Sequence, residues 1–209
     1  LKQAMGDLDE DVVKECLNAV MADGGSQASE AMEACQEGMN VIGDKFESGE
    51  YFVGDLIYAG ELMTEAVDIL KPALVGTGSD AAGGKVILCT VEGDLHDIGK
   101  NIVKSMVEAG GIEVIDLGID TKPAAIIKAM QDDDVHVVLL SGVLTLAVDS
   151  MKNIVEQTKA AGLLDDCKIL IGGAPVNEEA CKLVGADDWA SNPQKTVQKS
   201  QEWLAAYAG

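Results

Sequence analysis

The chain has 209 residues, with 36 acidic and 15 basic side chains and a formal net charge of −21. Because nucleic-acid affinity depends on Lys and Arg side chains that neutralise phosphates, this charge excludes a nucleic-acid role and equally disfavours binding to anionic membranes. Hydrophobic residues make up 47% of the chain, but no run approaches the roughly 20 apolar residues that span a bilayer, so we expect a soluble globular protein without a membrane partner.

The N-terminus and the cysteines bear on the cellular location. Residues 1–16 contain no basic segment followed by an apolar one, so no signal peptide is expected, and the missing initiator Met indicates a natural chain that starts earlier. The five cysteines form no Cys-x-x-Cys pair, the spacing that zinc sites and redox dithiols usually need. We therefore expect structural thiols, with Cys89 in a buried strand, and a cytoplasmic protein.

The first third of the sequence has helical periodicity. Apolar residues recur at helical spacing in three segments, 8–21, 28–39 and 51–70. The glycines at 24–25 and Gly43 are predicted breaks, and Pro72 is expected to end the last helix. The predicted apolar face of that helix comprises Phe52, Val53, Leu56, Ile57, Met63, Val67 and Leu70. Residues 1–72 are thus predicted to form a bundle of about four helices.

A linker is predicted at 73–84. This run consists of small residues with few large apolar ones, a composition typical of a flexible connector. Residues 76–81 imitate a dinucleotide-binding fingerprint, but they precede a predicted strand, whereas the true fingerprint follows one, so we discount this function.

From residue 85 onward, predicted strands and helices alternate. Short apolar runs, typical of strands buried on both faces of a parallel sheet, lie at 85–90, 113–117, 135–141 and 168–171, with a shorter candidate at 188–190. Helical segments follow at 97–109, 123–131, 148–160, 178–184 and 193–207. The alternation predicts a Rossmann-type α/β domain over 85–209, a doubly wound parallel sheet whose five strands favour the flavodoxin-like order.

Three loops are expected to meet at the carboxyl edge of this sheet, where ligands bind in such folds. They are 91–99 after the first strand, 141–145 after the third and 172–175 after the fourth. We therefore look for functional residues in these three loops.

The first loop contains a candidate metal ligand. A His on a loop over the sheet edge is free to turn its imidazole toward a borderline transition metal. Asp94, two residues before His96, is suited to accept the other ring N–H, which fixes the tautomer and strengthens the remaining nitrogen as a donor. Gly93 and Gly99 allow a bulky planar group to approach the backbone. The spacing alone leaves open a phosphate- or flavin-binding loop with an incidental His.

A family resemblance distinguishes these alternatives. Residues 93–99, Gly-Asp-Leu-His-Asp-Ile-Gly, resemble the Asp-x-His-x-x-Gly motif of cobalamin-binding domains of the methionine synthase type, and the likeness continues through 100–103. Two further family elements, Ser-x-Leu-x-Thr and a Gly-Gly loop, are similar to Ser141, Val143 and Thr145 and to Gly172 and Gly173. The helical half is similar as well, so nearly the whole chain looks like the stand-alone corrinoid proteins of methanogen and acetogen methyltransferase systems.

The resemblance implies a corrinoid cofactor, cobalamin or a relative, bound base-off and His-on. His96 replaces the nucleotide base as the lower ligand of cobalt, and Asp94 orients His96 and couples cobalt chemistry to a proton. Both are the expected catalytic residues, and His96 is the expected metal ligand. Phe46 and Val53 correspond to the residues that cover the upper face of the ring, which makes 1–72 a methyl cap. The other expected cofactor contacts are Gly93, Leu95, Asp97, Ile98, Gly99, Ser141, Val143, Thr145, Gly172, Gly173 and Ala174.

The resemblance also implies partners. The protein would accept a methyl group on Co(I) from a substrate-specific methyltransferase and deliver it to a second methyltransferase acting on a pterin or a thiol, with no turnover of its own. A reductive activation protein is a third expected partner. The partner enzyme determines the methyl donor. The possible donors include methylamines, betaines, methanol and aryl methyl ethers. The alternatives are a cobalamin mutase subunit, which needs a substrate domain above the ring, and a cobalamin-responsive regulator, which needs a DNA-binding or signalling module.

Two positions depart from the family pattern. Val143 stands where the family has Leu, which is a mild change of shape. Ala147 stands where methionine synthase has a hydroxyl side chain that completes the His–Asp relay, and Ala cannot form a hydrogen bond through its side chain. The relay would then stop at Asp94 or end in water. Outside these motifs, His136 begins a strand with no ligand partner nearby, and we expect a structural role for it.

Overall fold

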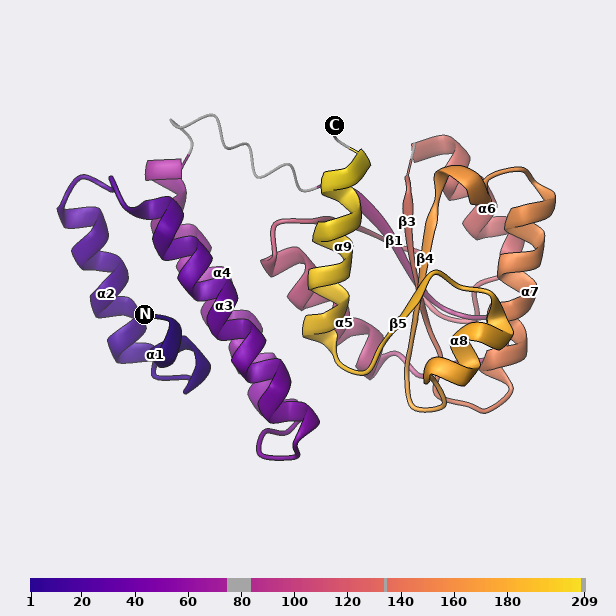
Figure 1. Ribbon diagram of the computed structural model, residues 1–209, viewed down its shortest axis with the longest axis horizontal. Helices are drawn as coiled ribbons and strands as arrows, with labels where there is room; N and C mark the ends of the chain where they lie inside the picture. The colour runs from indigo at the N-terminus through magenta and orange to yellow at the C-terminus, as the bar shows by residue number, and fades with distance from the viewer. Residues whose placement is uncertain (75–83, 134, 208–209) are drawn as a thin grey trace. The chain divides into compact units, whose positions relative to one another are not determined.

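The computed structural model describes residues 1–74, 84–133 and 135–207. The chain divides into two compact units, an N-terminal one with helices α1 to α4 and a second one with a sheet of five strands (Figure 1). Most of the predicted linker at 73–84, and with it the fingerprint-like run at 76–81, lies outside the described residues. Within the described ranges, no helix has the length and apolar character needed to cross a bilayer.

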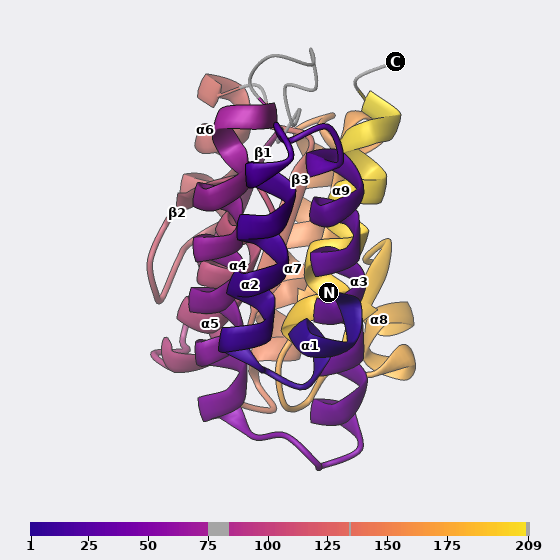
Figure 2. The same cartoon turned by 90° about the vertical axis from the view of Figure 1, so that its left-hand side faces the viewer.

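The N-terminal unit is a helical bundle, as predicted. Its elements are α1 (Lys2–Gly6), α2 (Glu10–Ala22), α3 (Ala28–Glu47) and α4 (Val53–Leu74). Helices α3 and α4 run alongside each other in opposite directions and are joined by the turn at 48–52 (Figure 2). The buried side chains between the helices include Met5, Val13, Leu17, Cys35, Met39, Ile42, Leu56, Met63 and Leu70.

Two predicted helix breaks in this unit are wrong. Gly43 is buried inside α3, because packing in the bundle outweighs the cost of about 1 kcal/mol that a glycine adds to a helix interior. Pro72 lies inside α4, which continues to Leu74. The helix loses little by this, because Pro72 stands in its last turn, where few backbone hydrogen bonds remain to be broken. The glycines at 24–25 do separate α2 from α3, and both have positive φ angles.

The predicted apolar face of α4 is also partly wrong. Leu56, Met63 and Leu70 are buried, but Phe52, Val53 and Ile57 are exposed. The buried stripe of α4 packs against α2 and α3, and a residue rotated away from that stripe lies outside the bundle core. The N-terminal end of α4 therefore presents apolar side chains on its surface.

The second unit is a parallel sheet with the strand order β2-β1-β3-β4-β5, the predicted flavodoxin-like order. The strands are β1 (Lys85–Thr90), β2 (Glu113–Asp116), β3 (Val137–Ser141), β4 (Lys168–Gly172) and β5 (Asp188–Ala190). Figure 1 shows two helices along one face, α5 (Ile98–Ala109) and α9 (Pro193–Tyr207). Along the other face lie α6 (Pro123–Asp133), α7 (Ala147–Ala160) and α8 (Glu178–Val184).

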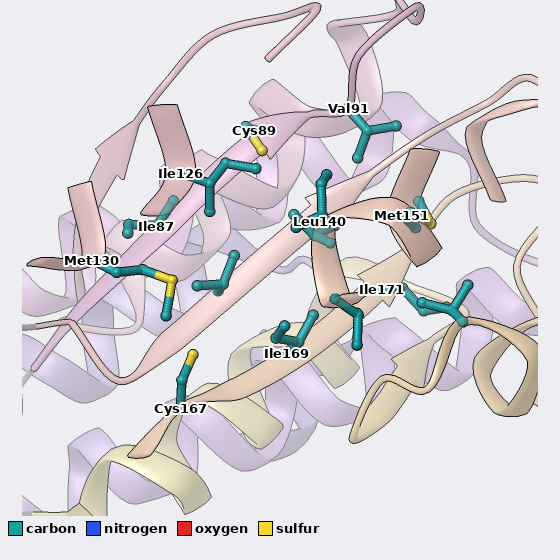
Figure 3. Packing of buried hydrophobic residues seen from close by; sticks show 14 of the residues in the cluster. Ile87, Cys89, Val91, Ile126, Met130, Leu140, Met151, Cys167, Ile169 and Ile171 are labelled. Carbon is teal, nitrogen blue, oxygen red and sulfur yellow. The ribbon is translucent and has the colours of Figure 1, made fainter. Parts of the chain in front are cut away.

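The core of this unit lies between the sheet and its helices. One cluster joins side chains of β1, β3 and β4 to those of α6 and α7, among them Ile87, Cys89, Leu140, Ile169, Ile126 and Met151 (Figure 3). Burial raises the pKa of the Cys89 thiol to about 12, which suits the predicted role as a small core residue. All five cysteines are free thiols, and all but Cys16 are buried.

The register of the strands sets the position of the loops. Thr90 pairs with Ser141, and Ser141 pairs with Gly172. Because the strands are parallel and end at the same level, the loops that follow β1, β3 and β4 emerge together at one edge of the sheet. This edge is where the predicted site residues of the second unit lie.

Candidate functional site

A hydrogen-bonded pair, Asp94 and His96, occupies the loop after β1. Asp94 Oδ1 lies 2.7 Å from His96 Nδ1 and also accepts the backbone N–H of His96 at 3.0 Å. Asp94 is completely buried, whereas the His96 side chain is 53% exposed. Because the bond with Asp94 engages Nδ1, the Nε2 atom of the imidazole is the one suited to a metal.

The second oxygen of Asp94 is held by the loop after β3. Asp94 Oδ2 accepts the backbone N–H groups of Val143 at 2.7 Å and of Leu144 at 3.0 Å. Burial alone raises the pKa of the Asp94 carboxyl, but the N–H groups of Leu144, His96 and Val143 and the His96 ring outweigh burial, so the pKa lies well below its ordinary value. The buried carboxylate is therefore ionised and joins two loops to the imidazole.

The hydrogen bonds of Asp94 bear on Ala147, which stands where methionine synthase has a hydroxyl side chain. In the described part of the chain, the partners of the Asp94 oxygens are His96 and the backbone amides of Val143 and Leu144. Amide N–H groups donate hydrogen bonds but do not relay a proton near neutral pH. Ala147 is buried at the start of α7, and a β-carbon on Gly142 would lie only 2.4 Å from the β-carbon of Ala147.

A buried ion pair stands at the other end of the loop. Lys100 is 3% exposed, and its Nζ lies 2.7 and 2.8 Å from the two carboxylate oxygens of Asp116 and 2.9 Å from Asn101 Oδ1. This pair ties the first turn of α5 to the end of β2. The residues between Asp94 and Lys100 are all exposed, so an accessible segment is held between two buried charged groups.

The exposed segment and its neighbours carry apolar side chains. Leu95 and Ile98 are 66% and 72% exposed, and Leu146, in the loop after β3, is 73% exposed. Ile119, Val143 and Leu144 add exposed apolar surface after β2 and β3. Exposed apolar side chains gathered at one edge of a sheet indicate a binding surface for a large apolar group.

Two glycines in the first loop serve different purposes. Gly93 has a φ of +83°, a backbone conformation that favours glycine. Gly99 has no such angle, and nothing lies within 4 Å of the place where a β-carbon would stand. The fold itself therefore does not require glycine at 99, and the space beside this residue is open.

The comparisons with known families agree with these features. Residues 84–197 match the B12 binding domain family, and residues 1–71 match a second family that is also described as a B12 binding domain.

The chain belongs to the B12-binding protein family.

Relatives with known names and structures include several corrinoid proteins. A corrinoid protein of Desulfitobacterium hafniense (strain Y51) is 34% identical over 206 residues, which cover 98% of this chain and 95% of that protein. The dimethylamine corrinoid protein of Methanosarcina barkeri is 35% identical over 185 residues, or 88% and 87% of the two chains. A crystal structure of a cobalamin-binding protein from Desulfitobacterium hafniense DCB-2 superposes with a TM-score of 0.90, with 50% identity and coverage of 97% and 96%.

The residues of the sheet edge fit a B12 cofactor. The imidazole of His96 is exposed, and its remaining nitrogen suits a cobalt ion that is already held by a macrocycle. The exposed side chains of Leu95, Ile98 and Leu146 suit the apolar parts of a large ring. The open space above Gly99 leaves room for that ring close to the backbone.

The structure brings together most of the residues expected to contact the cofactor in a B12-binding protein. The exposed residues Gly93, Leu95, His96, Asp97, Ile98 and Gly99 share the sheet edge with Ser141, Val143, Thr145, Gly172, Gly173 and Ala174. Phe46 and Val53 belong to the N-terminal unit, where Phe46 is half-buried and Val53 is exposed. Their assignment as cap residues stays a prediction.

Sequence reasoning missed a fourth loop at this edge, 117–122 between β2 and α6. Its Asp120 has a φ of +50° and accepts the Gly93 N–H through Oδ1 at 2.7 Å. Asp is one of the few residues besides glycine that adopt such a backbone conformation readily, and the pattern Gly-Ile-Asp at a predicted strand end was the available indication. The exposed Leu144 lies between two positions of the Ser-x-Leu-x-Thr element and Leu146 directly follows it, so the motif itself indicated neither.

Proposed function

We propose that this B12-binding protein is a methyl carrier, which receives a methyl group from a substrate-specific methyltransferase and delivers it to a second methyltransferase acting on a pterin or a thiol. The Asp94–His96 pair carries the proposal, because it offers one exposed imidazole nitrogen backed by a buried carboxylate. A relative named for dimethylamine supports the methyltransferase setting. Free thiols at all five cysteines suit a reducing cytoplasm.

The cofactor is proposed to bind base-off and His-on, with His96 Nε2 as the lower ligand of cobalt. A bound corrinoid would supply a cobalt centre that accepts and releases the methyl group. Asp94 holds the proton of the imidazole on Nδ1 and so keeps Nε2 available as the donor atom. Ser141, Val143 and Thr145 are assigned to the channel for the nucleotide tail, and Gly172, Gly173 and Ala174 to the backbone surface against which it lies.

Electron paramagnetic resonance of the Co(II) state tests this binding mode. The chain has two histidines, and the second one, His136, is bonded through Nδ1 to the carbonyl of Asp166 and stacks on Tyr207. Protein grown with histidine labelled with heavy nitrogen and loaded with unlabelled cobalamin should show an altered superhyperfine pattern, because the axial nitrogen then comes from the protein. The matched control is His96→Ala, which should lose the label effect. A pattern unaffected by the label would mean that the cofactor's own base, or no nitrogen, binds the cobalt.

The two units are assigned different tasks. Residues 85–209 are proposed to hold the corrinoid, and residues 1–72 to form the cap over the methyl-bearing face, with 73–84 as the linker between them. Phe46 and Val53 are the proposed cap residues. The exposed apolar side chains at the start of α4, among them Val53, support a covering role for this end of the bundle.

The carrier role is tested by stoichiometry. Reduced, cobalamin-loaded protein incubated with an excess of radiolabelled methyl iodide should take up one methyl group per corrinoid and pass it to no thiol or pterin unless a methyltransferase is added. A reductive activation protein is proposed as a further partner, which returns oxidised cobalt to the reduced state. Multiple turnovers by the protein alone would contradict the carrier role.

A further inference from the structure

The loop after β2 runs alongside the end of β1 and the start of the His96 loop. The N–H of Thr90 donates to the carbonyl of Gly118 at 2.9 Å, and the N–H of Thr121 donates to the carbonyl of Thr90 at 3.0 Å. Val91 and Thr121 form an isolated parallel bridge. The loop at 117–122 is therefore fixed along the strand from which the His96 loop departs.

Asp120 extends this contact to the two residues before Leu95. Its backbone N–H donates to the carbonyl of Asp94 at 3.1 Å, and its Oδ1 accepts the N–H of Gly93 at 2.7 Å. Asp120 thus holds the dipeptide Gly93–Asp94 at both ends. The φ of Asp120 is +50°, and non-glycine residues in such conformations persist where the surrounding structure holds them and cluster at functional sites.

The held dipeptide contains the residue that orients the imidazole. The side chain of Asp94 binds the ring of His96, while its backbone carbonyl is bound by Asp120. A shift of the Asp94 backbone would move its carboxylate relative to the N–H groups of Val143 and Leu144. Asp120 is exposed, so its side chain can be changed without opening a cavity in the core.

We propose that Asp120 is a positioning residue of the corrinoid site, which holds the Gly93–Asp94 backbone so that Asp94 presents His96 to cobalt. This inference rests on the proposed function, in which His96 is the lower ligand. Removing the side chain of Asp120 leaves the His96 imidazole and the Asp94 carboxylate intact but loosens the backbone that aligns them. The equilibrium of the loaded protein then shifts toward the state in which His96 is not bound to cobalt.

Three substitutions at one position separate the hydrogen bond from the backbone conformation. Asp120→Ala loses the acceptor and keeps the strained φ, Asp120→Gly loses the acceptor but relieves the strain, and Asp120→Asn keeps both an acceptor oxygen and a residue that tolerates the φ. We expect Ala and Gly to lower the His-on to His-off ratio by about tenfold, the low end of the range for outer-shell changes at metal sites. Asn should restore the ratio of the parent protein.

The measurement is the fraction of Co(II) protein with imidazole superhyperfine coupling, with the affinity for cobalamin as a control for tail binding. In the protein without cofactor, hydrogen exchange of the Gly93 amide should be faster in the Ala and Gly variants and unchanged in the Asn variant. If the parent protein shows no imidazole coupling, the proposed function fails. If the parent is His-on and Asp120→Ala matches it, or if Asp120→Gly matches the parent while Asp120→Ala does not, the positioning role of the side-chain bond is wrong.

Discussion

The backbone of Gly173 passes so close to Gly142 that a β-carbon on Gly173 would lie 1.9 Å from the carbonyl oxygen of Gly142. Gly173 also has a φ of +121°. The loops after β3 and β4 therefore touch through their backbones at the edge of the sheet. Glycine at 173 is required by the fold, whereas glycine at 99 has open space around it.

The two glycines predict opposite results for the same substitution. Gly173→Ala should lower the free energy of unfolding by roughly 3 kcal/mol, because it adds both backbone strain and a clash. Gly99→Ala should leave this free energy unchanged or raise it by up to about 1 kcal/mol, because alanine is the better helix residue in the first turn of α5. Denaturant unfolding of the cofactor-free protein measures both effects.

The substitution at Gly99 should also affect cofactor binding. Gly99→Ala should bind cobalamin more weakly in a titration followed by absorption, because the added methyl group occupies the space assigned to the ring. Ser105→Ala, at an exposed position further along α5 and outside the proposed site, is the control for a change in the same helix. Unchanged cobalamin affinity in Gly99→Ala would show that the ring does not lie over this position.

Asp94 and His96 should respond differently to mutation because one is buried and the other is exposed. The Asp94 carboxylate accepts four N–H groups, and in Asp94→Asn an NH₂ group must face some of them. This substitution should therefore lower the free energy of unfolding by about 1–3 kcal/mol. It should also weaken the His-on state by about 10- to 100-fold. His96→Ala removes one of the four donors to Asp94, so it should lower the unfolding free energy by only about 1 kcal/mol, and it should abolish the imidazole ligand. Denaturant unfolding and Co(II) spectra measure the two effects, and equal stability losses in both variants would contradict the assigned roles.

The ion pair of Lys100 with Asp116 predicts a pH dependence of stability. Burial alone raises the pKa of the Asp116 carboxyl, but Lys100, the Gly118 N–H and Lys104 together lower it by more, so the pKa lies below its ordinary value. The unfolded chain then takes up this proton first as the pH falls. The contribution of Asp116 is fully present above the ordinary Asp pKa of about 3.9 and is lost as the pH falls from there through the pKa of the folded state.

Urea unfolding at a series of pH values compares the parent protein with Asp116→Asn. The variant should be less stable by about 3 kcal/mol near pH 7, because Lys100 stays buried without its carboxylate, and this difference should shrink below about pH 4. Asp132→Asn, which removes an exposed partner of Lys128, is the control and should change stability by less than about 1 kcal/mol. A difference that does not change with pH would contradict the role of Asp116 ionisation.

The cap assignment predicts an effect on light sensitivity. In protein loaded with methylcobalamin, Phe46→Ala should speed the photolytic loss of the methyl group severalfold while leaving cobalamin affinity unchanged, because a shield is removed and tail binding is not. Phe52→Ala is the matched variant, since Phe52 is an exposed aromatic residue near the start of α4. If Phe52→Ala alone accelerates the loss, Phe46 is a residue of the bundle and the shield is Phe52.

The sequence by itself determined the strands, most of the helices and the local hydrogen-bond pattern of one loop. Continuous apolar runs predicted the strands, and their alternation with helical segments predicted a doubly wound parallel sheet, whose five strands favoured the observed order without fixing it. Asp94 and His96 are two residues apart, so their hydrogen bond could be expected from a local pattern. Periodicity and short motifs are properties of neighbouring residues, which is why sequence reasoning reaches them.

Tertiary structure decided the contacts between distant segments. Val143 and Leu144 bind Asp94 from 49 and 50 residues away, and Asp120 binds Gly93 from 27 residues away. The inclusion of Gly43 in a helix and the exposure of Phe52 likewise depend on which helices pack together. Such contacts follow from the register of strands and the path of loops, and no local pattern contains them, because the same short segment can meet different partners in different folds.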